Sequence, residues 1–493
     1  MNLSLLIIIP LVTAIAVLLV KSKLQVKWIS LIGAVLQIII SLFLLFYYES
    51  AVSNGNTEQM LFQQQYEWFP ALHIGFHLGV DGISVAMILL TAFVVIAGIL
   101  VSWNIEKMTK EFYFLLLLLS VGAYGFFLSL DLFMLFFFLE VAVIPKYLLI
   151  GIWGSGNKEY SANKLALMLM GGSALILVGL LGLYFGSTER SFDLMRLSQN
   201  QISSNIQMIC FPLLFIGFGV FSGLFPFHTW IPDGHSSAPT AGSMFLAGIS
   251  MKLGGYGCLR VATYLLPEGA KEYANFVIIL SAIGILYGAF VTMMQRDLKY
   301  LNAYSSVSHC GFVLLGIGML TTTAFTGAVI QMVSHGLMTA LFFAVIGMIY
   351  QRTHTRNIDE MQGLLKTMPF IVTILFIVGF CSLGLPGLSG FVAEITVFMG
   401  SWQHTDTFHR VITIAACASI VVTAVYILRA VTKVAMGPVK TTYAHLKDAA
   451  WNEKLAAIIL VFGIIAIGVA PFWLNDLIRP GAEIIMKRIT GGQ

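Results

Sequence analysis

Long apolar stretches recur along the whole chain, and they constrain its fold more than any other feature. A helix that crosses a bilayer needs about 20 mostly apolar residues, and by that measure the sequence contains about fourteen such segments. Their approximate positions are 3–20, 29–47, 83–101, 112–130, 132–153, 165–185, 208–230, 241–265, 275–294, 299–319, 324–350, 370–402, 411–436 and 455–474. Because the bilayer interior lacks water, these segments must be helical. We therefore predict an all-α polytopic membrane protein with about fourteen transmembrane helices.

The composition excludes several other classes of protein. Of the 493 residues, 58% are hydrophobic and 10% are charged, and the mean hydropathy is +0.90, as in polytopic membrane proteins. The net charge of +4 is small, and no basic run indicates nucleic-acid binding. All five cysteines lie in apolar segments without a CxxC pair, which argues against an iron–sulfur, haem or zinc site. We expect no metal and no cofactor in this chain.

The placement of lysine and arginine predicts the orientation in the membrane. Basic residues are about three times as frequent in the odd-numbered connections as in the even-numbered ones, which makes the odd connections cytoplasmic. Both termini then face the outside. The odd connections carry Lys21, Lys23, Lys27, Lys107, Lys110, Lys158, Lys164, Arg296, Lys299, Arg352, Arg356, Lys366, Lys440, Lys447 and Lys454; the even ones carry Arg190, Arg196, Arg260, Lys271 and Arg410.

Two spans are interrupted by glycine and proline. The seventh contains "SGLFPFHTWIPDG" and the twelfth contains "SLGLPGLSGF". Helices 4–8 and 9–13 form two sets of five, each broken at its fourth member, and an odd number of spans per set inverts their topology. The expected division is 1–111 (helices 1–3 with an external loop), 112–265 (first repeat), 266–436 (second, inverted repeat) and 437–493 (helix 14 and a tail).

Ionisable side chains lie near the middle of six spans. Each costs about 3 kcal/mol or more in the bilayer, so a function is the default interpretation. A packed core histidine is an equally good interpretation of His228, and Arg429 and Lys433 are placed to reach a cytoplasmic helix end. The groups are Glu140, Lys146, His228, Lys252, His309, His335 and Glu394. Carboxylate, amine and imidazole groups can exchange protons when burial and neighbouring charges bring their pKa values toward neutrality. No nucleotide-binding motif or metal-ligand cluster accompanies them, so a proton relay here would need partner subunits to drive it.

Four motifs resemble one known family. "FPFHTWIPDGHSSAPTAGSMFLAGISMKLGGYGCLR", "QRDLKYLNAYSSVSHCGFVLLGI", "VSHGL" and "LPGLSGFVAEITVFMGSW" are similar to the M-type antiporter-like subunits of respiratory complex I. The resemblance covers nearly the whole chain. It implies a non-redox subunit of a proton-translocating NADH:quinone oxidoreductase in a bacterial-type inner membrane. It also implies L-type and N-type partner subunits, with flavin and iron–sulfur clusters in other subunits and no active site for NADH or quinone here.

The resemblance assigns roles residue by residue. Glu140 matches the fifth-helix glutamate that modulates a nearby lysine, and Lys252 matches the eighth-helix lysine that bridges the two halves. His309 and His335 match the histidines of a water-filled central axis. Glu394 matches the twelfth-helix glutamate that is typical of M-type subunits.

One position departs from the family pattern. Phe221 stands where the family has a seventh-helix lysine, whereas Lys146 has appeared on the fifth helix, one residue after Pro145. We predict that the amine has moved between helices and lies within about 4–6 Å of Glu140, directly or through one water, and close to the Phe221 ring. The alternative is that Lys146 extends to the cytoplasmic surface.

Three functions compete at this point. The first is a proton-translocating subunit of complex I, which Glu394 and the whole-chain match favour. The second is a subunit of an Mrp-type cation/proton antiporter, which shares the fold and several motifs. The third is a structural spacer, against which the retention of several costly buried charges argues.

Overall fold

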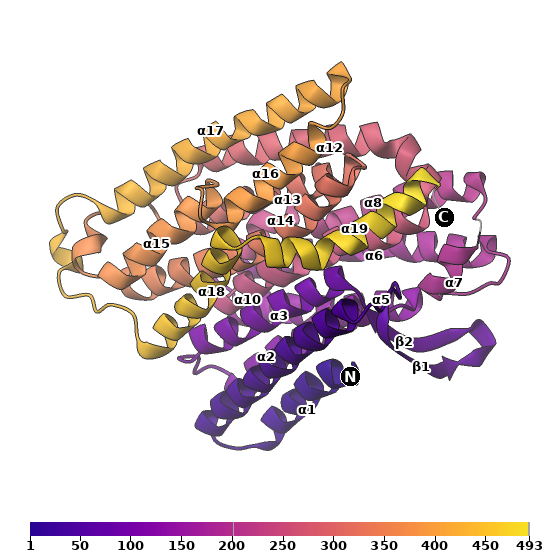
Figure 1. The fold of residues 1–493 in the computed structure, drawn as a ribbon. Coiled ribbons are helices and arrows are strands. Elements are labelled where there is room, and N and C mark those ends of the chain that lie inside the picture. Colours follow the sequence, from indigo (N-terminus) through magenta and orange to yellow (C-terminus); the bar gives the residue numbers. More distant parts are fainter. Residues whose placement is uncertain (201, 492–493) are drawn as a thin grey trace.

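Helices occupy most of the chain, as the ribbon in Figure 1 shows. The computed structural model describes residues 1–200 and 202–491. Ten helices in these residues are long and apolar enough to cross a membrane. The helices are α1 (Leu5–Leu19), α2 (Lys23–Ser53), α3 (Gly82–Val101), α4 (Thr109–Leu128), α5 (Leu132–Trp153), α6 (Lys158–Gly186), α7 (Leu194–Gln199), α8 (Ser204–Ser222), α9 (Trp230–Ser237), α10 (Thr240–Phe245), α11 (Met251–Gly257), α12 (Pro267–Met294), α13 (Leu298–Gly318), α14 (Thr322–Thr353), α15 (Pro369–Ser382), α16 (Ser389–Ser401), α17 (Thr407–Ala435), α18 (Trp451–Val469) and α19 (Phe472–Thr490).

The polytopic membrane class is therefore confirmed. The exact number of spans and the division of the chain into two repeats stay predictions. Helix α14 lies at the centre of the bundle: all of its most apolar 18-residue window is buried, as is 94% of that of α3. By contrast, only a third of the corresponding windows of α2 and α17 is buried. These peripheral helices expose apolar side chains, which suits contact with lipid or with other membrane subunits.

Both expected interruptions are present. Helix α8 ends at Ser222, where Gly223 adopts a φ of +87°, and α9 begins only at Trp230. Helix α15 ends at Ser382 and α16 begins at Ser389, with Gly384 at +75° in the gap. Only glycine adopts these left-handed angles without strain. Spans seven and twelve are each two helices joined by irregular backbone.

The eighth span has an irregularity that the sequence did not predict. The short helix α11 is flanked by two π-helical turns, Leu246–Ser250 and Cys258–Thr263. Turns of this kind widen a helix locally and often occur at functional sites. In this protein they bracket the segment that carries Lys252.

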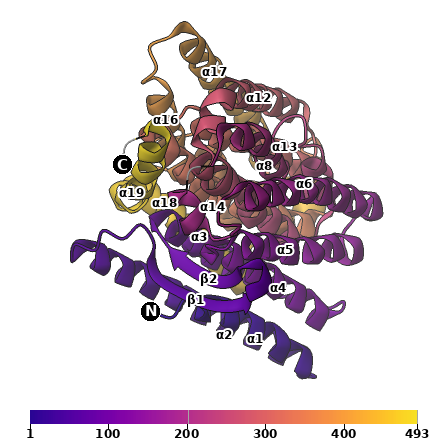
Figure 2. The ribbon, with the colours of Figure 1, turned by 90° about the vertical axis from the view of Figure 1, so that its right-hand side faces the viewer.

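Two further elements were missed by the sequence analysis. Strands β1 (Leu61–Phe69) and β2 (Ile74–Val80) pair as an antiparallel hairpin within the long polar connection, and they project beside the N-terminal helices (Figure 2). The predicted C-terminal tail is helix α19, which buries one apolar face and packs across α3 and α14 (Figure 1). Neither element has the long uniform apolar run by which spans are recognised.

Candidate functional site

A line of buried ionisable groups begins at Lys252 on α11. Its side chain is 1% exposed. Its ammonium donates a hydrogen bond to the carbonyl of Ala247, which lies in the preceding π-turn, and sits 2.8 Å from Nδ1 of His335 on α14. No carboxylate in the described residues forms an ion pair with it. Lys252 and His335 are therefore close enough to exchange a proton directly.

The line continues through His309 on α13 to Glu394 on α16. The His335 and His309 rings lie 5.4 Å apart between centroids, and His309 Nδ1 lies 3.4 Å from a carboxylate oxygen of Glu394. The other ring nitrogen of His309 is 3.2 Å from the hydroxyl of Ser382. All four ionisable groups are buried, so the structure brings Lys252, His335, His309 and Glu394 into one contiguous chain.

The interruption between α15 and α16 makes room for the end of this chain. A Cβ atom added to Gly384 would lie 2.8 Å from Oε2 of Glu394. The broken helix thus supplies a glycine against which the carboxylate packs, in keeping with the rule that irregular backbone at membrane depth lines functional cavities.

Lys146 is buried and does not reach the surface. It is 1% exposed, its ammonium has no hydrogen-bond partner among the described residues, and that ammonium lies 5.7 Å from the centroid of the Phe221 ring. The predicted proximity to Phe221 is therefore observed, and the surface-seeking alternative is wrong. A cation over an aromatic face gains about 1–2 kcal/mol when desolvated.

The hydrogen-bond partner of Glu140 lies on α6, and the expected separation of about 4–6 Å between Glu140 and Lys146 stays a prediction. The Glu140 carboxylate accepts a hydrogen bond from Ser173 of α6 and makes no ion pair with Lys146 within the described part of the chain. The two charges on α5 therefore point to different neighbours: the amine to α8 and the carboxylate to α6. An exchange between them would need a bridging group.

Phe221, whose ring faces the Lys146 ammonium, lies where α8 contacts the helix that carries Lys252. A Cβ atom on Gly254 of α11 would lie 2.3 Å from the backbone nitrogen of Ser222 and 2.9 Å from the carbonyl carbon of Phe221. Helices α8 and α11 thus touch backbone to backbone at this point.

The surroundings of His228 are mainly aromatic. It is 3% exposed, its Nδ1 has no partner among the described residues, and its ring packs on Phe225 and Tyr287 with centroids 5.5 and 4.9 Å away. It lies in the break between α8 and α9 and away from the chain that starts at Lys252. Its observed contacts are those of an aromatic core residue.

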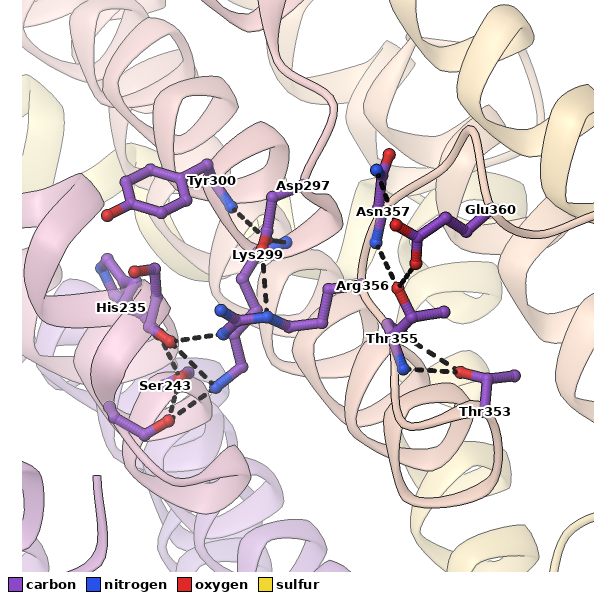
Figure 3. A network of polar contacts seen from close by, with 12 residues as sticks. His235, Ser243, Asp297, Lys299, Tyr300, Thr353, Thr355, Arg356, Asn357 and Glu360 are labelled. Atoms are coloured by element: carbon purple, nitrogen blue, oxygen red, sulfur yellow. Dashed lines mark hydrogen bonds and ion pairs between the residues drawn. The ribbon is translucent and has the colours of Figure 1, made fainter. Parts of the chain in front are cut away.

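Sequence reasoning missed a second group of buried charges near the start of α13. Lys299 is only 5% exposed, and its ammonium donates to the carbonyls of Ala238 (2.6 Å) and Ser236 (3.4 Å). Arg356 donates to the same Ser236 carbonyl and pairs with Asp297, as Figure 3 shows. Lys299 had been counted as a loop charge because it lies at a span boundary. Its carbonyl partners come from a distant part of the sequence.

His235, beside this group, is the most enclosed histidine of the region. It has no exposed surface, neither ring nitrogen has a partner within the described ranges, and its ring stacks on Phe343 at 5.1 Å. Its chain neighbour Ser236 accepts a hydrogen bond from Lys299, so this imidazole belongs to the segment that covers the buried amine.

An ion pair that the sequence did not indicate lies toward the hairpin. Arg260 and Asp81 are 2% and 3% exposed and pair directly, while Asp81 also caps the start of α3 through Ser84 N. Arg260 had been assigned to an external connection. The sequence does not indicate that these two residues pair, because 179 positions separate them.

The fold and this chain of groups define a class: polytopic membrane proteins that carry ions through buried amine, imidazole and carboxylate groups beside interrupted helices. The family model described as "NADH:quinone oxidoreductase/Mrp antiporter, TM" matches residues 129–421. NAD(P)H-quinone oxidoreductase chain 4 of Gloeobacter violaceus is 35% identical over 491 residues, which cover 98% of this chain and 92% of that relative. The protein belongs to the chain 4 subunits of the NAD(P)H-quinone oxidoreductases.

Solved structures agree with this assignment. A chain of respiratory complex I from Thermus thermophilus with bound NADH superposes with a TM-score of 0.91 at 26% identity, over 99% of this chain and all of that one. A chain of the Mrp complex from Dietzia sp. DQ12-45-1b gives a TM-score of 0.86 at 17% identity, over 99% of this chain and 98% of that one. The second likeness shows a shared fold alone, so it does not favour the antiporter alternative.

Proposed function

We propose that this subunit translocates protons along the chain Lys252, His335, His309 and Glu394 while other subunits of the oxidoreductase reduce quinone. One observation carries the proposal: four ionisable side chains from four helices form a contiguous buried line. A structural spacer would gain nothing from groups that each cost about 3 kcal/mol or more in a membrane.

The order of the groups suits proton transfer. The Lys252 ammonium can pass a proton to His335 across 2.8 Å, and the carboxylate of Glu394 stabilises a protonated His309 at 3.4 Å. The 5.4 Å between the two imidazole rings is within the reach of ring rotation or one bridging water. Each step moves a proton from one ionisable side chain to the next, with no redox chemistry in this chain.

Proton uptake is best placed at Lys299 and His235. Lys299 begins α13 on the side where lysine and arginine accumulate, and its side chain is buried. His235 would then connect Lys299 to Lys252. Asp233, which pairs with Lys164 at 2.7 Å and accepts from Tyr300, adds a charged group at the same end.

Lys146 and Glu140 supply charges to the first of the two predicted repeats, residues 112–265. The amine that faces Phe221 takes the place of a lysine on α8, and Glu140 modulates it through α6 or a bridging water. His228 is assigned to packing in the break rather than to the relay.

The relatives and the charge pattern support a proposal for the setting of the subunit. We place it in a bacterial-type inner membrane with both termini on the outer side, with L-type and N-type antiporter-like subunits as partners. The flavin and iron–sulfur clusters belong to other subunits of the complex. The chain itself contributes no site for NADH or quinone.

The substitution Lys252→Met tests the proposal in the assembled oxidoreductase. It removes the first proton donor of the line and keeps a long apolar side chain, so proton pumping and NADH–quinone turnover should both fall about tenfold or more, a barrier change of at least about 1.4 kcal/mol. Lys271→Met, at an exposed lysine outside the line, is the matched control and should leave both rates unchanged. Normal pumping in an assembled Lys252→Met complex would overturn the proposal.

A further inference from the structure

Two histidines and an aspartate meet in the connection between α16 and α17. His404, Asp406 and His409 can each offer one ligand atom, and these atoms lie within 4.8 Å of one another. The two imidazole rings are stacked, with centroids 4.0 Å apart and planes inclined by 16°. Helix crossings counted from α5, whose N-terminus contacts the hairpin, place this connection on the hairpin side of the protein.

Neighbouring groups hold each member of the cluster in place. Nε2 of His404 donates to the carbonyl of Met319 at 2.7 Å, and because a carbonyl only accepts, Nδ1 of that ring keeps its lone pair free. Nδ1 of His409 donates to both carboxylate oxygens of Asp406, at 2.9 and 2.8 Å. Asp406 is itself fixed as the N-cap of α17 through His409 N.

We propose that His404, Asp406 and His409 form a binding site for a divalent transition metal ion of the Zn²⁺ type. Two imidazoles and one carboxylate are the donor set that zinc takes in sites with three protein ligands and an open position. Imidazole donors exclude Mg²⁺ and Ca²⁺, which take oxygen ligands. A backbone carbonyl that holds the distal nitrogen of His404 is the outer contact by which metal-binding histidines are oriented.

The geometry needs only small movements to close around an ion. Ligand bonds of about 2.0–2.2 Å place the ligands of a tetrahedral zinc ion about 3.3–3.6 Å apart. The proton between His409 and Asp406 is the one that a metal ion would replace, since ligating groups must be deprotonated. The absence of CxxC pairs in the sequence says nothing about a site of this kind, which uses no thiolate.

The position of the site gives its occupancy a consequence for proton transfer, and this second step rests on the proposed function. His404 contacts the end of α13, which carries His309, while the connection itself joins α16, which carries Glu394, to α17. Gln403 adds a bond to Thr323 at the start of α14. A bound ion would fasten the outer ends of these helices together and slow any pumping cycle in which they shift.

Metal binding is measured first, on the purified oxidoreductase, with Zn²⁺ itself as the probe. After incubation with micromolar Zn²⁺ and gel filtration, the unaltered complex should retain one more zinc per complex than the His409→Gln and Asp406→Asn variants. His73→Gln, at an exposed histidine on the same side, is the control and should retain as much as the unaltered complex. In the Asp406→Asn variant, asparagine still caps the N-terminus of α17, so a loss of zinc from this variant would not be due to misfolding of that helix. Equal zinc content in all four proteins overturns the site.

Pumping is measured second, and it tests the effect of the bound ion separately from the existence of the site. Micromolar Zn²⁺ should inhibit the unaltered and His73→Gln complexes at least severalfold more than the His409→Gln complex. Equal inhibition of all three, with zinc still bound in the expected way, overturns the effect on pumping and leaves the site standing. Zinc content does not depend on which residues carry protons, so failure of the proposed relay would leave the binding result unchanged.

Discussion

At the scale of single residues, the clearest departure from the family pattern concerns one lysine. Phe221 stands where the family has that lysine on α8, and Lys146 is present on α5 instead. The Lys146 ammonium is buried, lacks a hydrogen-bond partner in the described structure and lies over the Phe221 ring. Lys146→Met should therefore lower proton pumping about tenfold, a barrier change of about 1.4 kcal/mol. Adding Phe221→Lys should restore part of the rate, because it returns an amine to α8. Pumping by inside-out vesicles measures both effects.

The control for this exchange is Lys366→Met, which removes an exposed lysine outside the relay. Native gels should show equal assembly of the single variant and the control. An assembled Lys146→Met complex that pumps at the normal rate would show that the amine is not needed. A failed rescue alone would reflect packing, since lysine and phenylalanine differ in shape.

The sequence predicted the members of the central line but not all of the buried charges. Lys252, His335, His309 and Glu394 each stand in an apolar run, so the cost of burial singled them out. Lys299 lies at a span boundary and is buried only because the segment 236–238 folds over it. A single sequence contains no signal for such long-range contacts.

At the scale of elements, Gly254 determines how closely helices α8 and α11 approach each other. A Cβ atom on Gly254 would lie 2.3 Å from Ser222 N and 2.5 Å from the carbonyl oxygen of Phe218, and backbone atoms cannot rotate away. Gly254→Ala should therefore separate α8 from α11 and cost about 1–3 kcal/mol. We expect less assembled complex on native gels after mild heating, and slower pumping.

Gly151→Ala on α5 is the matched control, because an added Cβ there meets nothing within 4 Å. It should leave assembly unchanged or slightly improved, since alanine favours helix over glycine. Equal heat resistance of the Gly254→Ala variant and this control would mean that α8 and α11 have room to move.

Elements were predictable where one physical rule dominates. Glycine and proline inside apolar runs indicated both interrupted spans, since they release backbone groups that lipid cannot satisfy. The hairpin was missed because "LFQQQYEWF" has no apolar alternation, and it is held by contacts such as the 2.7 Å pair between His77 and Asp193. Helix α19 was missed because its apolar residues lie on one face only and alternate with charged ones, so the segment lacks the continuous apolar run that indicates a transmembrane helix.

At the scale of the whole molecule, the outer surface fits a bilayer or neighbouring membrane subunits. Large apolar side chains are exposed along the peripheral helices, among them Phe46 on α2, Val421 on α17 and Phe462 on α18, at 66%, 68% and 65%. Helices that cover the centre of the bundle therefore present an apolar face outward, the reverse of a water-soluble bundle. Ion pairs such as Lys23 with Glu106 and Lys433 with Asp359 lie at the helix ends on the predicted cytoplasmic side.

The orientation of the whole molecule can be tested with two single cysteines. Asn56 and Thr442 are both exposed, in connections at opposite ends of the bundle. Because basic residues mark the cytoplasmic side, Asn56→Cys should react with a membrane-impermeant maleimide in intact cells. Thr442→Cys should react only after permeabilisation. Four native cysteines are buried and Cys417 is half-buried, so the unaltered protein should give little background. The reverse labelling pattern would place both termini in the cytoplasm, and proton uptake would then start on the hairpin side.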